Sequence, residues 1–418
     1  MFFSLSIVII LFFVLLVSFF KIKLPFAWFL FFYANFFIGT AWQMDLFPDE
    51  SNLIHFFSIL AGLTSYFAVS SMLVRRWNLS DLQENFIKQP VIISSPLKNN
   101  RIFFFLLFSL IVSAIYYISI GQNILFMILA GTEFEDFSGT RISMYSGEEY
   151  YYPGYVNQFK NTIFPICAAY YLSSEALRSK SIFLKLLILV PIGIFILAGT
   201  GQRAFLVHSF LALCLTYFLT FSFSKKMIFN LFLGTVIVFI VFSILSFFYY
   251  DLSEEGFFGV IVKLVERIFF VQQEGGLVGF HVIYDLPRAY LTEWWASIVG
   301  ILPNVSGSDL AHQIHEIMYG SSRGTVPISH VGSAYYNGGF FLVLVFFGIL
   351  GFFHTYLFLR FISGKKLLFR CICYGFIFHY SSALLFGGPF TYIDNGLITI
   401  FILLYIVQKV PAITIRRI

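Results

Sequence analysis

Arginines are the residues of this chain best suited to bind an anionic substrate. An arginine side chain presents a planar fork of N–H donors, which can pair with two phosphate oxygens at once. Arg203 follows Gly199 and Gly201 in a short turn before an apolar segment. A helix that starts in this way favours anions, because its first backbone N–H groups have no partner within the helix. We therefore predict an anion site at Arg203, and four further arginines of the predicted outer loops could also bind phosphate oxygens, namely Arg267, Arg288, Arg323 and Arg141.

Histidines and carboxylates outside the apolar segments could take a proton from a reacting hydroxyl group. Histidine changes its protonation state near neutral pH, which suits it to this role. His330 stands just before a glycine-rich stretch that enters an apolar segment. The candidate bases are His330, His281 and Asp285, with Glu293 as a further carboxylate.

Three more histidines lie inside apolar segments, where a polar side chain is a functional candidate by default. His208 follows Arg203 closely enough along a helix to support the predicted anion site. His354 and His379 are expected instead to form hydrogen bonds between helices.

The sequence predicts no metal ion and no cofactor. The predicted outer segments contain no Asp-x-Asp pair, and the four cysteines lack the spacing of metal ligands. Cys371 and Cys373 would point about 200° apart on a helix and could not pair with each other. We expect chemistry that uses side chains alone, and no nucleic acid as a partner.

The composition indicates what kind of element positions these residues. Of 418 residues, 59% are hydrophobic and only 11% are charged, whereas soluble domains average about 25% charged residues. So few charges could not cover the surface of a soluble fold, and disordered chains are far more polar. The chain is therefore predicted to be a polytopic membrane protein surrounded by a lipid bilayer.

The apolar segments predict the fold class. About 20 apolar residues cross a bilayer as a helix, and the backbone must satisfy its own hydrogen bonds there. We expect an all-α helix bundle of about 11 transmembrane helices, within a range of 10 to 12, that forms a single membrane domain over 1–418. The first segment lacks a basic start and a small-residue cleavage site, so it is expected to remain attached. The predicted spans are 2–20, 24–43, 52–74, 102–120, 161–177, 182–199, 204–223, 227–249, 338–359, 369–386 and 395–410.

The sparse charges predict the orientation of these spans. Positive residues accumulate on the cytoplasmic side of membrane proteins. If the turn at 21–23 is cytoplasmic, the inner segments hold 19 of the 26 Lys and Arg residues but only 3 of the 21 acidic residues. This assignment predicts an outer N-terminus and a cytoplasmic C-terminus.

Two predicted outer loops, 121–160 and 250–338, are much longer than a connection requires. Long loops of this kind are often functional, and both are rich in aromatic residues and glycine. From Glu255 to Glu274 the charged residues gather on one side of a helical projection, which predicts a short amphipathic helix at the membrane surface.

The whole chain resembles the bacterial O-antigen polymerases, the Wzy-type polymerases of oligosaccharide repeat units. The features that carry the resemblance are ten to twelve helices with two large outer loops, the Gly-Thr-Gly-Gln-Arg-Ala-Phe turn at 199–205, and the end of the second loop. That end contains Thr325-Val326-Pro327 and the run from Gly332 to Phe340, which is similar to a Gly-x-x-Tyr-x-Asn-x-Gly motif of the family.

The resemblance implies a metal-independent membrane glycosyltransferase of the bacterial inner membrane. Its substrate would be an undecaprenyl-diphosphate-linked oligosaccharide, processed on the periplasmic face, and a chain-length regulator protein would be a possible partner. An acceptor hydroxyl would attack the anomeric carbon while the lipid diphosphate leaves. The outer arginines would stabilise the diphosphate, and a base would take the proton.

Three other functions fit the same layout. A flippase for lipid-linked oligosaccharides would need charges along a path through the membrane, but the predicted helices carry few. An O-antigen ligase would share both the layout and the acceptor chemistry. A structural or assembly factor is the fourth possibility.

Overall fold

A computed structural model describes the residues 1–19, 25–77, 79–131, 153–178, 183–202, 204–221, 272–302, 305–321 and 324–409, with isolated short stretches between 229 and 270. Within this part of the chain every regular element is a helix, and the only β-type pairings are two isolated bridges. The predicted all-α class is confirmed. The four cysteines are buried and free.

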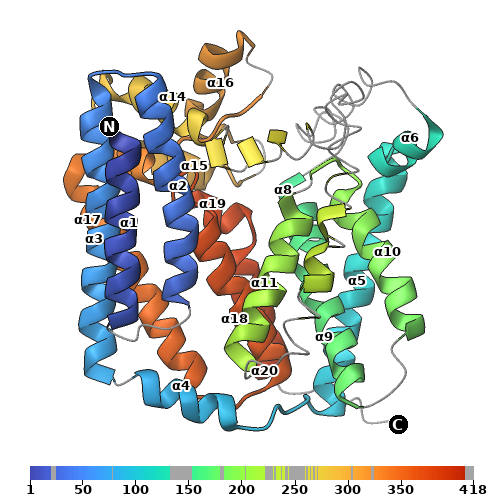
Figure 1. Ribbon diagram of the computed structural model, residues 1–418. Coiled ribbons are helices and arrows are strands. Elements are labelled where there is room, and N and C mark those ends of the chain that lie inside the picture. The colour runs from blue at the N-terminus through green and yellow to red at the C-terminus, as the bar shows by residue number, and fades with distance from the viewer. Residues whose placement is uncertain are drawn as a thin grey trace. The chain divides into compact units, whose positions relative to one another are not determined.

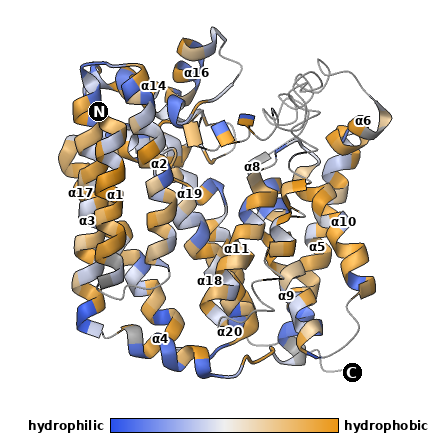
Figure 2. Cartoon of the chain, in the orientation of Figure 1, coloured by the Kyte–Doolittle hydropathy of each residue, from blue (hydrophilic) through white to orange (hydrophobic). Residues whose placement is uncertain are grey.

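Among the described residues, three helices are long and apolar enough to cross a membrane, namely Ser51–Trp77, Lys98–Ile120 and His330–Ile362. Figure 2 shows hydrophobic residues along most of α1 and α10 as well. Four shorter apolar helices, Phe2–Leu16, Phe183–Ala198, Ala204–Thr220 and Leu397–Gln408, coincide with predicted spans. These helices indicate a membrane protein. Most of the predicted span 227–249 lies outside the described residues.

The chain divides into two compact units that interleave along the sequence. Unit 1 comprises Met1–Phe86, Leu252–Gly364 and Ser381–Thr391, and unit 2 comprises Ile87–Asp251, Lys365–Tyr380 and Tyr392–Ile418. Each unit is described separately below.

Unit 1 is built on helices that pack through aromatic rings. Helix α17 lies along α3, and α1 lies along α2 (Figure 1). The rings of Phe29 and Tyr66 stack at 3.7 Å between centroids. Gly351 lets α17 approach α3 closely, because an added methyl group there would lie 2.5 Å from the carbonyl oxygen of Tyr66. The bounds are α1 (Phe2–Phe19), α2 (Phe26–Leu46), α3 (Ser51–Trp77) and α17 (His330–Ile362).

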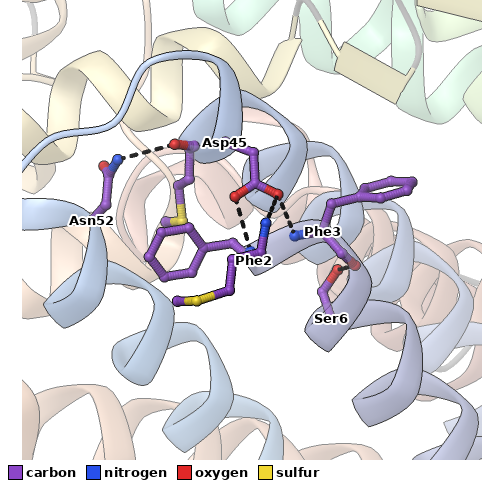
Figure 3. A network of polar contacts seen from close by, with 7 residues as sticks. Phe2, Phe3, Ser6, Asp45 and Asn52 are labelled. Carbon is purple, nitrogen blue, oxygen red and sulfur yellow. Dashed lines mark hydrogen bonds and ion pairs between the residues drawn. The ribbon is translucent and has the colours of Figure 1, made fainter.

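Asp45 joins the end of α2 to the start of α1 (Figure 3). Its carboxylate accepts hydrogen bonds from the backbone N–H groups of Phe2 and Phe3, each at 2.9 Å, and from the N-terminal ammonium group at 2.8 Å. Burial alone would raise the pKa of Asp45, but these donors lower it overall. The first N–H groups of a helix have no partner within it, so Asp45 acts as a cap supplied by a neighbouring helix.

The second predicted outer loop contains helices of its own, as expected. They are α14 (Gln272–Tyr284), α15 (Thr292–Val299) and α16 (Leu310–Tyr319). Half of the residues of the amphipathic helix predicted for 255–274 lie outside the described residues.

The following span was predicted to start at 338, and the structure has a helix boundary there. Helix α17 combines two helices that meet across a kink at Gly338 and Gly339, and the first of them begins at His330. The side chain of Ser329 caps this earlier start by accepting a hydrogen bond from the N–H of Gly332 at 3.0 Å. Gly338 and Gly339 form the kink within α17, where Gly339 has φ +65° and ψ −162°. Only glycine adopts this conformation easily. The predicted start at 338 therefore holds for the second of the two helices, whereas the short first helix from His330 was not predicted.

Unit 2 contains the first predicted outer loop and the helices around it. A single turn of π-helix, η1, continues directly into α9, so that α8, η1 and α9 form one continuous helical run. The elements that lie wholly in this unit are α5 (Pro96–Ile120), α6 (Ile124–Ala130), α8 (Pro153–Asn157), η1 (Gln158–Ile163), α9 (Phe164–Leu177), α10 (Phe183–Ala198), α11 (Ala204–Thr220) and α20 (Leu397–Lys409). Three further helices contribute residues to both units: α4 (Leu79–Lys88), α18 (Leu368–Ala383) and α19 (Phe390–Asp394).

Candidate functional site

In unit 1 the segment that leads into α15 is fixed to the first turns of α17 by backbone hydrogen bonds. The N–H of Ala289 donates to the carbonyl of Tyr336 at 2.9 Å, and that of Leu291 donates to the carbonyl of Asn337 at 3.2 Å. Between them Tyr290 has φ +47° and Leu291 has φ +71°. Residues other than glycine rarely adopt a positive φ, and such backbone strain persists only where the surrounding structure imposes it. The segment is therefore held in one particular conformation.

Arg288 belongs to this segment and lies against α17. The centre of its guanidinium group is 3.9 Å from the centroid of the Tyr335 ring, which is close enough for a cation–π interaction. Its Nη1 atom is buried and has no hydrogen-bond partner within the described residues. A buried charged donor without a partner is costly. The arrangement leaves at least one N–H group of a positively charged side chain available for an anion.

Glu293, in the first turn of α15, is oriented by neutral donors. Its Oε2 accepts a hydrogen bond from Nδ2 of Asn337 at 2.8 Å, and its Oε1 accepts one from Oγ of Ser297 at 3.0 Å. Asn337 is buried, and its Nδ2 also donates to the carbonyl of Ser333 at 2.9 Å. Glu293 thus keeps a fixed orientation without pairing to a cation in the described part of the chain.

Trp294 of α15 makes a second close contact with α17. Its indole Nε1 donates to Oγ of Ser333 at 2.8 Å. The backbone of Gly388 fits directly against this pair, since an added methyl group would lie 2.8 Å from Nε1 of Trp294. Residues from the second outer loop, α17 and the 387–388 turn therefore form one polar cluster in unit 1.

His330 lies in the same cluster but is buried, with 1% of its surface exposed. Its Nδ1 contacts the carbonyl oxygen of Gly387, so this nitrogen must carry the proton and donate. In the neutral ring Nε2 is then the acceptor. The tautomer suits a base, but the ring does not face solvent.

Two aromatic rings beside the cluster are open to solvent. Tyr290 is 79% exposed and Trp295 is 69% exposed. Tyr290 lies between Arg288 and Glu293 in the sequence, and Trp295 follows Glu293 two residues later. Exposed rings of this kind present flat apolar faces, which suit sugar rings.

The remaining candidate bases lie elsewhere in unit 1. Nδ1 of His281, at the end of α14, contacts Oδ2 of Asp49 at 2.8 Å, with the two side chains 56% and 36% exposed. The hydrogen bond from Ser51, partly opposed by desolvation and aided by His281, lowers the pKa of Asp49 to about 2. Asp285 is exposed in the turn after α14. Neither His281 nor Asp285 contacts the residues of the cluster in any hydrogen bond or ion pair among the described residues.

Of the five arginines predicted to bind an anion, the structure places one. Arg288 is described above. The other four, namely Arg203, Arg267, Arg323 and Arg141, lie outside the described residues.

The histidines of the apolar segments form buried hydrogen bonds. In unit 2, Nδ1 of His208 lies 2.9 Å from Nε2 of His379. In unit 1, His354 links Tyr66 of α3, at 2.7 Å, to Ser381, also at 2.7 Å. His354 and His379 thus make the predicted interhelical bonds. Support of Arg203 by His208 is a prediction that falls outside the described residues.

From the sequence, no role in the site was assigned to Tyr335, Asn337, Ser333 and Trp294, although Tyr335 and Asn337 are the Tyr and Asn of the Gly-x-x-Tyr-x-Asn-x-Gly motif. Ser333 and Asn337 are four residues apart and would share a helix face, but this signal required α17 to start at His330. Lys160, in unit 2, was also missed, because from the sequence it was used only in the count of positive charges on the outer side. Its buried position becomes visible only in the folded chain.

Among the described residues, no group of three or more His, Cys, Asp and Glu side chains is placed to hold a metal ion. Comparisons with protein-family models, with curated proteins and with solved structures each gave no match to this chain.

Proposed function

We propose that this chain is an integral membrane glycan polymerase with about 11 transmembrane helices, and that it joins undecaprenyl-diphosphate-linked oligosaccharide repeat units on the periplasmic face of the bacterial inner membrane. The observation that carries the proposal is Arg288, whose cationic side chain has a buried N–H group without a partner in the described structure. The resemblance of the sequence to Wzy-type polymerases supplies the substrate class.

The position of Arg288 suits a lipid-linked diphosphate. Its segment is hydrogen-bonded to the first turns of α17, and α17 is one of the three helices apolar enough to cross a membrane. A headgroup at the membrane surface would present its phosphate oxygens at this level. Donors that are fixed before the reaction stabilise charge that develops on a leaving group.

The proposed reaction moves one proton and one glycosyl group. An acceptor hydroxyl oxygen attacks the anomeric carbon, the bond from that carbon to the diphosphate oxygen breaks, and the lipid diphosphate leaves with the electron pair. The carboxylate of Glu293 takes the hydroxyl proton. We favour Glu293 over His330 because Glu293 is partly accessible, while the His330 ring is buried. The exposed rings of Tyr290 and Trp295 would hold the sugars.

The proposal is tested with purified protein in liposomes that contain a lipid-linked repeat unit. Wild-type protein is expected to make a ladder of lipid-linked polymers. Arg288→Ala should abolish the ladder, and Arg288→Lys should restore it only in part, because a lysine cannot bridge two oxygens. Arg76→Ala is the control. Arg76 lies in the last turn of α3, where its guanidinium group is beside the ring of Trp77.

The same assay distinguishes the other functions. Movement of the repeat unit across the bilayer without a ladder would identify a flippase, and transfer of a finished glycan to a lipid A core acceptor would identify a ligase. A full-length ladder from Arg288→Ala would refute the assigned role of Arg288.

A further inference from the structure

Unit 2 contains a lysine in an unusual environment. Lys160 is 1% exposed and is among the largest fully buried side chains of the protein. It lies in η1, the π-helical turn between α8 and α9. Turns of this kind are rare and often occur at functional sites.

No acidic side chain of the described residues forms an ion pair with Lys160. Its Nζ atom lies instead 4.7 Å from the centroid of the Tyr116 ring and 5.8 Å from that of Tyr117, both on α5. Aromatic faces attract a cation but compensate only part of what it loses on leaving water. The environment of Lys160 therefore supplies aromatic faces and lacks a described counter-ion.

Two hydrogen-bond donors without partners lie at or next to Gly199, where Tyr117 also ends. A methyl group added to Gly199 would overlap Nδ2 of Asn123 and would lie 2.6 Å from Oη of Tyr117, so Asn123 and Tyr117 meet at this point. Nδ2 of Asn123 and Oγ1 of Thr200 are both buried without a hydrogen-bond partner.

The residue next to Lys160 shows the same deficit. Both side-chain polar atoms of Asn161 are buried without partners, and the residue is 2% exposed. Buried polar groups in proteins nearly always have partners, so several orphaned groups in one region indicate a missing ligand or water.

We propose that Lys160, with the donors of Asn123 and Thr200, forms a phosphate-binding site in unit 2. A cation beside unpaired N–H and O–H donors matches an anion with several oxygens rather than a cation or a neutral molecule. The phosphate could belong to a lipid headgroup or to a free phosphate compound. The proposal does not depend on the proposed polymerase activity.

The test uses full-length protein in nanodiscs of phosphatidylcholine, with Arg288→Ala as the background so that the first site cannot bind. Binding of inorganic pyrophosphate is measured by calorimetry, and retention of phosphatidic acid is measured by native mass spectrometry. In this background Lys160→Met should weaken binding about tenfold or more, as expected for loss of a charge-assisted hydrogen bond. Thr200→Val, which keeps the side-chain shape, should weaken it by a smaller factor.

Lys185→Met is the matched control, because Lys185 lies in the same unit and is already paired with Glu175. It should bind like the background protein. Binding of pyrophosphate identifies a site for free phosphate compounds, and retention of phosphatidic acid alone identifies a headgroup site. Absence of both, or equal binding by Lys160→Met and the background, would overturn the proposal. If Lys160→Met fails to fold, unchanged binding by Thr200→Val overturns it as well. Because the polymer ladder is not part of this measurement, failure here leaves the role of Arg288 untouched.

Discussion

Asn337→Asp is the substitution for which the structure predicts the most distinctive response. It replaces the Nδ2 donor, which lies 2.8 Å from Oε2 of Glu293 and 2.9 Å from the carbonyl of Ser333, by an oxygen of nearly the same size. At low pH the introduced carboxyl is protonated and can still donate one of these bonds. The free energy of unfolding then falls by about 1 kcal/mol, which is the typical contribution of one neutral hydrogen bond.

At higher pH the variant has two carboxyls at hydrogen-bond distance. If both were ionised, their repulsion at 2.8 Å would cost about 6 kcal/mol with an effective dielectric constant of ~20. The folded protein can avoid this by keeping one proton, which costs ~1.4 kcal/mol for each pH unit above the value near 4 at which an unfolded carboxyl ionises. At pH 7 this amounts to about 4 kcal/mol, so retention of the proton is the cheaper outcome. The folded state binds more protons than the unfolded state, and the stability of the variant must therefore fall as pH rises.

Thermal unfolding in nanodiscs between pH 5 and pH 8 measures this response. The loss of stability of Asn337→Asp relative to wild type, measured as a lower melting temperature, should increase steadily over this range. Asn337→Ala is the control, because it removes the same two hydrogen bonds without adding a charge, and its deficit should not depend on pH. If the two variants show the same, flat deficit, Glu293 and Asn337 are not neighbours as described.

Two further predictions concern other contacts of unit 1. Asp49→Asn should lower the free energy of unfolding by about 1 kcal/mol at pH 7, because Asp49 accepts hydrogen bonds from Ser51 but its contact with His281 is largely exposed. Since the pKa of Asp49 is lowered to about 2, this contribution should fade as pH falls from about 4 towards 2. A series of melting curves in which the difference between variant and wild type stays constant over this range would contradict the prediction. Gly388→Ala should break the Trp294–Ser333 hydrogen bond, since the added methyl would lie 2.8 Å and 2.9 Å from the two bonded atoms; it should destabilise the protein by about 1–3 kcal/mol and stop ladder formation. The control is Gly154→Ala, whose methyl would lie 3.8 Å from its nearest neighbour and which should melt like wild type. Equal melting temperatures for the two variants would argue against the close approach of Gly388 to Trp294 and Ser333.

Some features of the site followed from local sequence patterns. Arg288 and Glu293 were selected because a cation and carboxylates stand together in a long polar segment, and the structure places both against α17. The first part of α17, from His330 to the kink, was not predicted, because it precedes the glycine pair at which the span was expected to start. The cap at Ser329 requires a hydrogen bond to a residue three positions later, and sequence alone cannot rank it against the glycines.

The role of each histidine depended on contacts between distant segments. His330 is buried by a turn 57 residues further along the chain, and His354 is held between Tyr66 and Ser381. No local pattern encodes such pairs. The same holds for Lys160, whose burial results from the packing of η1 against the aromatic residues of α5.

The sequence by itself determined the helical class of the described residues and the presence of segments apolar enough to cross a membrane, because hydropathy sums over neighbouring residues and needs no knowledge of the fold. Only the tertiary structure decided which polar groups have partners and which are left free. Hydrogen bonds and burial depend on side chains that approach from remote parts of the chain, as Arg288 on Tyr335 and Lys160 on Tyr116 demonstrate. The composition thus identifies the class of protein, whereas packing identifies the few charged residues available to bind a ligand.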